Sequence, residues 1–133
     1  HYYTFKDENK ARLRPVALFD LLINNADRKG SHVIIQKRMR KIFLIDHGLC
    51  FHEEDKLRTV IWDFAGETIP SELIADIEKF REALSNPGLR SALERYLIPE
   101  ELAALEARAA ELIATPVFPL LPKDRRAFPY PPL

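Results

Sequence analysis

Two short β-rich runs, separated by a basic stretch, constrain the fold of this chain more than any other feature. His32 to Gln36 and Lys41 to Asp46 are rich in branched and apolar residues, and Lys37-Arg38-Met39-Arg40 lies between them. Runs of this length joined by a short polar segment are typical of a β-hairpin. Ile42 to Ile45 is apolar at every position, so we expect this second strand to be buried on both faces. The chain is therefore predicted to contain one small antiparallel unit.

Helical periodicity surrounds this unit on both sides. Apolar residues recur at helical spacing from Asn9 to Asn25, and asparagine tolerates the turn conformations that close a helix. Further helices are expected at about 57–64, 73–84, 89–96 and 99–114. The pattern predicts a mainly α domain with one small β-hairpin, an α+β fold, over residues 1–115.

The last part of the chain is rich in proline. Pro116, Pro119, Pro122, Pro129, Pro131 and Pro132 exclude a helix or a central strand there. Residues 116–133 are therefore predicted to form an extended tail. Its aromatic residues Phe118, Phe128 and Tyr130 indicate that the tail packs along the domain.

Composition excludes several classes of protein. The chain has 133 residues, with 20 basic and 20 acidic side chains, so no global field draws it to nucleic acid or to an anionic membrane. We expect no nucleic-acid partner, and we interpret Lys37 to Lys41 as a solvated turn. No apolar run is long enough for an integral membrane segment. A single cysteine, Cys50, fits a cytoplasmic protein, and the missing initiator methionine suggests a piece of a longer product.

The conspicuous polar residues bracket the hairpin. Asp27 opens the loop before the first strand, and Asp46 closes the second strand. Because the start of one hairpin strand lies beside the end of the next, we expect Asp27, His32 and Asp46 to converge. Two carboxylates and an imidazole can bind a divalent metal and accept a proton. Phosphoryl transfer uses a carboxylate to orient the attacking hydroxyl and another to hold magnesium.

Two motifs connect this pattern with a known family. Asn24-Asn25-Ala26-Asp27-Arg28 precedes the hairpin, and Ile45-Asp46-His47-Gly48-Leu49-Cys50-Phe51 ends it. The pair resembles the catalytic and metal loops of protein kinases, and more closely those of phosphatidylinositol 3- and 4-kinases. It also resembles a group of uncharacterised bacterial proteins with phosphatidylinositol-kinase-like C-terminal lobes, which share a Leu-Arg-Thr-Val stretch like Leu57 to Val60. The resemblance covers roughly Phe19 to Phe64.

The resemblance implies a kinase C-terminal lobe that uses ATP with Mg²⁺ or Mn²⁺. Asp27 would be the catalytic aspartate, and Arg28 would steady the catalytic loop. Asp46 would hold the metal, and Lys29 and His32 would contact the nucleotide. His32 stands where protein kinases place a metal-binding asparagine, so it is also a candidate metal ligand, although imidazole suits manganese better than magnesium. Lys29 stands where the lipid kinases usually have histidine.

A kinase also needs an N-terminal lobe, and the sequence of this chain does not contain the motifs of that lobe. Four glycines leave no glycine-rich phosphate loop, so we expect an N-terminal lobe upstream and no activity from the fragment. The phosphoacceptor is not indicated. Two alternatives remain: a pseudokinase or nucleotide-binding regulatory module, and a small metal-dependent hydrolase. The hydrolase would use Asp27, His32, Asp46 and His47 as ligands.

Overall fold

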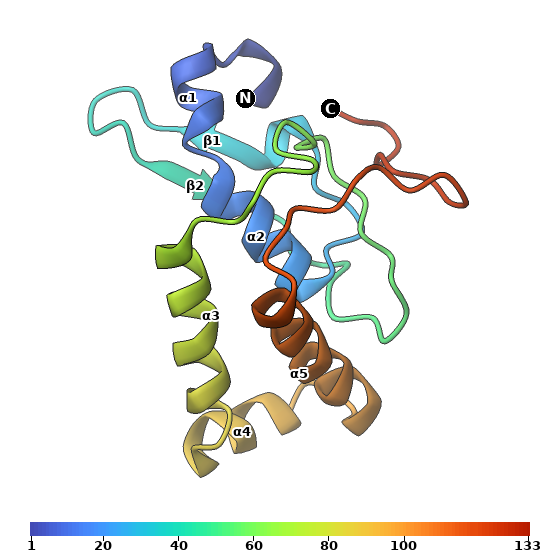
Figure 1. The fold of residues 1–133 in the computed structure, drawn as a ribbon. Coiled ribbons are helices and arrows are strands. Elements are labelled where there is room, and N and C mark those ends of the chain that lie inside the picture. The colour runs from blue at the N-terminus through green and yellow to red at the C-terminus, as the bar shows by residue number, and fades with distance from the viewer.

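The computed structural model describes residues 1–133 and shows a mixed α+β fold with five helices and one antiparallel hairpin. The elements are η1 (Tyr2–Thr4), α1 (Asp7–Ala11), α2 (Arg14–Ile23), η2 (Gly30–His32), β1 (Val33–Ile35), β2 (Ile42–Leu44), α3 (Ser71–Ala83), α4 (Pro87–Glu94) and α5 (Pro99–Ala114). In Figure 1, α1, the hairpin and both chain ends occupy one end of the molecule, and α3, α4 and α5 occupy the other. Helix α2 lies between them.

The first predicted helix is divided into α1 and α2. Pro15 stands in the first turn of α2 and has no N–H to donate to the carbonyl of Ala11, so the helical bonding cannot continue through it. The Arg14 side chain donates to that carbonyl instead, at 3.0 Å. Helix α2 ends where predicted, because Asn24 adopts the left-handed conformation with φ of 54°.

The hairpin is confirmed, but the predicted burial of its second strand is wrong. Val33 pairs with Leu44 and Ile34 pairs with Phe43 in antiparallel register. Val33 is fully buried, whereas Ile34 and Phe43 are 42% and 50% exposed. Successive side chains of a strand point to opposite faces, and only one face of this two-stranded sheet is covered by the core. The outer face carries apolar side chains that no other element covers.

The helices after residue 70 agree closely with the predictions. Helix α5 buries Leu102, Leu105 and Ala109, whose spacing places them on one face, and it packs against α3 and α2. Asn86 begins α4 by accepting a hydrogen bond from the N–H of Gly88 at 2.8 Å.

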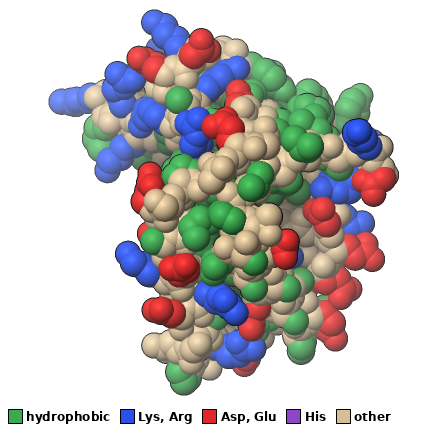
Figure 2. Space-filling view, viewed as in Figure 1, with side chains coloured by type: hydrophobic (Ala, Val, Ile, Leu, Met, Phe, Trp, Pro, Cys, Tyr) green, Lys and Arg blue, Asp and Glu red, His purple; other side chains and the backbone are tan.

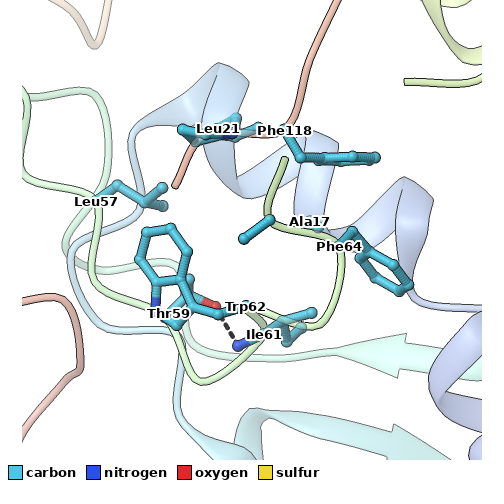
Figure 3. A pocket seen from close by; sticks show the side chains of 10 residues that line it. Ala17, Leu21, Leu57, Thr59, Ile61, Trp62, Phe64 and Phe118 are labelled. Carbon is cyan, nitrogen blue, oxygen red and sulfur yellow. Dashed lines mark hydrogen bonds between the residues drawn. The ribbon is translucent and has the colours of Figure 1, made fainter. Parts of the chain in front are cut away.

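The helix predicted over 57–64 is absent, and this prediction is wrong. Thr59 forms an isolated bridge with Arg28, and its N–H donates to the carbonyl of Ala127 at 3.1 Å. The main-chain groups thus bond to distant segments rather than along a helix. Apolar side chains of this segment are buried all the same: Leu57, Val60, Ile61 and Phe64. Figure 3 shows Leu57, Ile61 and Phe64 beside α2 and Phe118, around a cavity of about 20 Å³.

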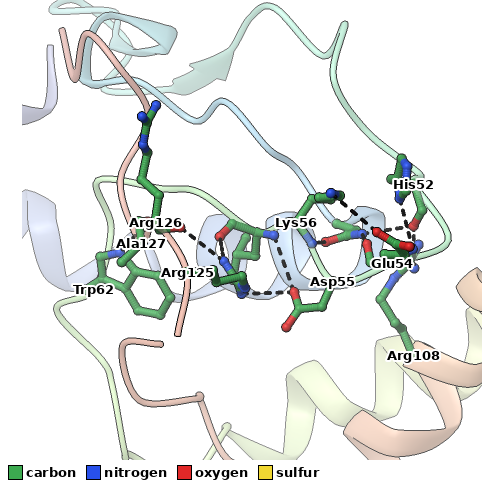
Figure 4. A network of polar contacts seen from close by, with 11 residues as sticks. His52, Glu54, Asp55, Lys56, Trp62, Arg108, Arg125, Arg126 and Ala127 are labelled. Carbon is green, nitrogen blue, oxygen red and sulfur yellow. Dashed lines mark hydrogen bonds and ion pairs between the residues drawn. The ribbon is translucent and has the colours of Figure 1, made fainter. Parts of the chain in front are cut away.

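Residues 52–56 are irregular but are fastened from three sides (Figure 4). From the end of α2, the Asn24 side chain donates to the carbonyls of His52 and Glu54 at 2.9 and 2.6 Å. From α5, Arg108 donates to the His52 carbonyl at 3.3 Å. From the tail, Arg125 pairs with Asp55 at 3.0 Å. Side-chain hydrogen bonds therefore replace regular secondary structure in this segment.

The tail is extended and lies along the domain, mainly through its backbone. Phe118 is buried and packs against Phe64 at 5.6 Å between ring centroids. Trp62 donates to the carbonyl of Ala127 at 3.2 Å. Of the three tail aromatics expected to anchor it, only Phe118 is buried, since Phe128 and Tyr130 are 43% and 81% exposed.

Candidate functional site

The loop that carries Asp27 is held by a buried amide. Asn25 is fully buried, and its side-chain oxygen accepts the N–H of Asp27 at 2.9 Å. The amide nitrogen of Asn25 donates to Oδ1 of Asp20 at 3.1 Å. Both halves of the amide are therefore satisfied, and they fix the main chain at Asp27 relative to α2.

A buried ion pair connects this loop to the end of the hairpin. The Arg28 side chain has no exposed area, and its Nε lies 2.9 Å from Oδ2 of Asp20, which is itself 1% exposed. Nη2 of Arg28 donates to Oδ1 of Asp20 at 2.9 Å. Nη1 donates to the carbonyl of Ile45 at 3.1 Å, next to Asp46. Arg28 is thus placed to hold the two loops and not to touch a substrate.

His32 links the two aspartates at the base of the hairpin. Its Nδ1 lies 3.0 Å from the carbonyl oxygen of Asp27, and its Nε2 lies 3.6 Å from Oδ2 of Asp46. The N–H of Lys29 points at the same Nδ1 at 3.4 Å, and Nε2 faces Asp46. His32 thus contacts the main chain of Asp27 and the side chain of Asp46 at the base of the hairpin. That the two carboxylates share one cation stays a prediction.

Oxygen atoms of both carboxylates remain open to a ligand. The nearest cation to the Asp27 carboxylate is Nζ of Lys29, at 3.9 Å. The Asp46 side chain is 60% exposed, adopts the left-handed region with φ of 57°, and accepts only a long 3.4 Å bond from Gly48. Magnesium is often bound by one or two carboxylates that share it with phosphates and water. These residues fit that mode of binding.

A metal site built from protein side chains alone is not formed. No group of three or more His, Cys, Asp and Glu side chains gathers closely enough to hold an ion. His47 packs against the ring of Phe19, with 5.8 Å between centroids. The four-ligand arrangement of the hydrolase alternative therefore receives no support from the geometry.

Burial alters the titration of two neighbours of the cluster. Burial, followed by the nearby charge of Arg28, lowers the pKa of His47. Burial and the negative charge of Asp20 raise the pKa of the Cys50 thiol to about 11. Cys50 is therefore protonated at neutral pH and is not an activated nucleophile.

Asp20 was missed as a site residue, although the sequence contains a signal for it. It falls on the apolar stripe of α2 with Leu13, Val16 and Ala17, at spacings of three, four and seven residues. A carboxylate at a core position indicates a buried partner, because an unpaired buried charge is strongly unfavourable.

The largest hollow of the surface lies elsewhere. This groove of about 860 Å³ runs between α2, α5 and the start of the tail, and none of Asp27, His32 and Asp46 lines it. It does not extend the cluster at the hairpin.

The fold and the cluster define an α+β domain with two carboxylates and an imidazole at the base of a hairpin. Protein Rv2133c of Mycobacterium tuberculosis is 42% identical over 120 residues, which cover 90% of this chain and 42% of that protein. The chain thus spans less than half the length of this bacterial relative. No protein-family model matches the chain, and no solved structure matches it. None of its helices has the length and apolar character needed to cross a bilayer.

Proposed function

We propose that the chain is the metal-binding and catalytic lobe of an ATP-dependent phosphotransferase resembling phosphatidylinositol 3- and 4-kinases. One observation supports this most: the ring of His32 touches the main-chain carbonyl of Asp27 on one side and the carboxylate of Asp46 on the other, residues far apart in sequence. A kinase needs this pairing, with one carboxylate for the acceptor hydroxyl and another for the metal.

Each residue of the cluster has a role in this proposal. The carboxylate of Asp27 orients the acceptor hydroxyl and receives its proton. Asp46 would hold Mg²⁺ or Mn²⁺, and His32 would steady Asp46 or serve as a further ligand. When bound, the ion neutralises the charge of the phosphates. Lys29 lies beside Asp27 and offers a cation to the phosphates.

The proposal requires a second lobe outside the 133 residues. That lobe would supply the glycine-rich cover and the lysine that a kinase places over the phosphates. A curated relative of more than twice the aligned length is consistent with a longer protein. The phosphoacceptor is left open.

A nucleotide-binding module without turnover is the second candidate. It is favoured by His32, which stands where kinases use an asparagine to hold a second metal and whose Nε2 lies 3.6 Å from the Asp46 carboxylate. Such a module would bind nucleotide and metal but release no phosphate.

The test uses Asp46→Asn in the full-length protein. Asparagine keeps the shape of the side chain and tolerates the left-handed conformation of position 46, so only the charge is lost. We expect the affinity for ATP with Mg²⁺ or Mn²⁺, measured by titration calorimetry, to fall at least tenfold. Asp76→Asn, at an exposed position of α3, is the matched control and should leave affinity unchanged.

A second variant separates the two candidates. Asp27→Asn should retain nucleotide binding and lose phosphate release, provided that the parent protein releases phosphate at all. Unchanged nucleotide affinity in Asp46→Asn would remove the basis of both candidates.

A further inference from the structure

The turn between β1 and β2 is a fully exposed basic projection. Every residue from Gln36 to Lys41 is exposed, and the turn extends away from the body of the molecule in Figure 1. It contains four cationic side chains around one methionine: Lys37, Arg38, Arg40 and Lys41 around Met39. Figure 2 shows Lys and Arg side chains gathered over this corner. We name residues 36–41 the basic turn.

Most of this charge is uncompensated. Arg40 is paired with Glu8 at 3.2 Å, whereas Lys37, Arg38 and Lys41 form no ion pair. The helical half of the chain has the opposite character: residues 63–114 carry 11 acidic and 5 basic side chains. A chain of zero net charge is thus polarised, with its positive end at the hairpin. An anionic surface would attract that end and repel the other.

The basic turn is held in a fixed orientation. Arg40 adopts the left-handed region with φ of 53°, which is unfavourable for a residue with a side chain. The guanidinium of Arg12 donates to the carbonyl of Arg40 at 2.6 Å, next to the Arg40–Glu8 pair. Two contacts from α1 and its C-terminal end therefore fasten the turn before any partner arrives. A preformed surface loses less entropy on binding than a mobile loop.

Apolar side chains accompany the charges. Met39 is 55% exposed at the centre of the turn. Ile34 and Phe43 form a cross-strand pair on the outer face of the hairpin, and each is at least 42% exposed. Phosphate backbones of nucleic acids need only the cations. A lipid surface uses both, because cations contact the headgroups and apolar side chains enter the interface.

We propose that the basic turn docks the chain on an anionic membrane surface, with Met39 inserted among the headgroups and Lys37, Arg38 and Lys41 contacting their phosphates. This proposal does not depend on phosphotransfer. The binding is peripheral, reversible and sensitive to salt.

Cosedimentation with lipid vesicles tests the proposal on the 133-residue chain. We expect binding to vesicles of phosphatidylcholine with phosphatidylserine, and little to phosphatidylcholine alone. A variant with Lys37→Gln, Arg38→Gln and Lys41→Gln should bind roughly 100-fold more weakly, at about fivefold per cation removed. Met39→Ser should weaken the binding of the parent chain, and this loss should persist at high salt, where screening removes the electrostatic contribution to binding.

A matched control removes three cations from the opposite end. Lys79→Gln, Arg81→Gln and Arg95→Gln make the same change in net charge at exposed positions of α3 and the end of α4. This control should bind vesicles as the parent does, and circular dichroism should show all variants folded. Equal loss in both triple variants would overturn the proposal, because net charge alone would then explain binding. Binding to an oligonucleotide but not to anionic vesicles would overturn it as well.

Discussion

The buried pair of Asp20 and Arg28 allows a quantitative test of the site. In Asp20→Ala, Arg28 loses the carboxylate that accepts its hydrogen bonds at 2.9 Å from both Nε and Nη2. Its remaining partner is the carbonyl of Ile45, and the side chain has no exposed area through which water could replace the loss. Breaking a buried pair in this way costs about 3–5 kcal/mol. That is a large part of the roughly 5–15 kcal/mol that holds a typical domain folded.

Urea unfolding followed by circular dichroism measures this cost. The double variant Asp20→Leu with Arg28→Met removes both charges, and its stability should recover part of the loss, because the buried Asn25 amide still lacks its acceptor. Glu8→Ala is the control, because it breaks the exposed pair with Arg40 and should cost less than about 1 kcal/mol. A loss in Asp20→Ala no larger than in Glu8→Ala would refute the reasoning, since it would mean that water reaches the Arg28 guanidinium.

Two further predictions concern the packing. With its pKa raised from 9.0 to about 11, Cys50 should react with iodoacetamide about 100-fold more slowly at pH 8 than in urea, and its rate should keep rising up to pH 11. The burial of this protonated thiol contributes stability below pH 9 that is lost as the pH rises through about 11. Phe118→Ala should lower the free energy of unfolding in urea by about 3–5 kcal/mol. It should also shift the fluorescence of Trp62, because the tail carbonyl that accepts the Trp62 N–H becomes less well held. Phe128→Ala, at an exposed ring, should leave both nearly unchanged.

Local sequence signals predicted the hairpin and the helices after residue 70 well. The range 99–114 agrees with α5 because a proline at its start and a regular apolar stripe are both local. Position 24 ends α2 because its asparagine accepts the left-handed conformation without help from the rest of the fold. The base of the hairpin could likewise be predicted, since a short antiparallel unit fixes which ends meet.

Features that depend on distant segments could not be predicted. Residues 57–64 have helical spacing, yet their main chain bonds to Arg28 and to the tail, which periodicity cannot reveal. Strand β2 is apolar at every position, which predicts burial on both faces. No element of this chain covers its outer face. The apolar stripe of α2 indicates that Asp20 is buried, but it cannot identify the partner, because Arg28 reaches Asp20 from a loop outside the helix.

The irregular stretch at residues 52–56 has a consequence for how the protein tolerates change. A surface loop usually accepts extra residues, because its backbone is bonded to solvent. Here the carbonyls of His52 and Glu54 are bonded to Asn24, and Asp55 is bonded to Arg125. An inserted residue would pull these anchors out of register in α2 and the tail at once. Residues 52–55 are exposed, yet we expect an insertion in this stretch to be tolerated as poorly as one in the core.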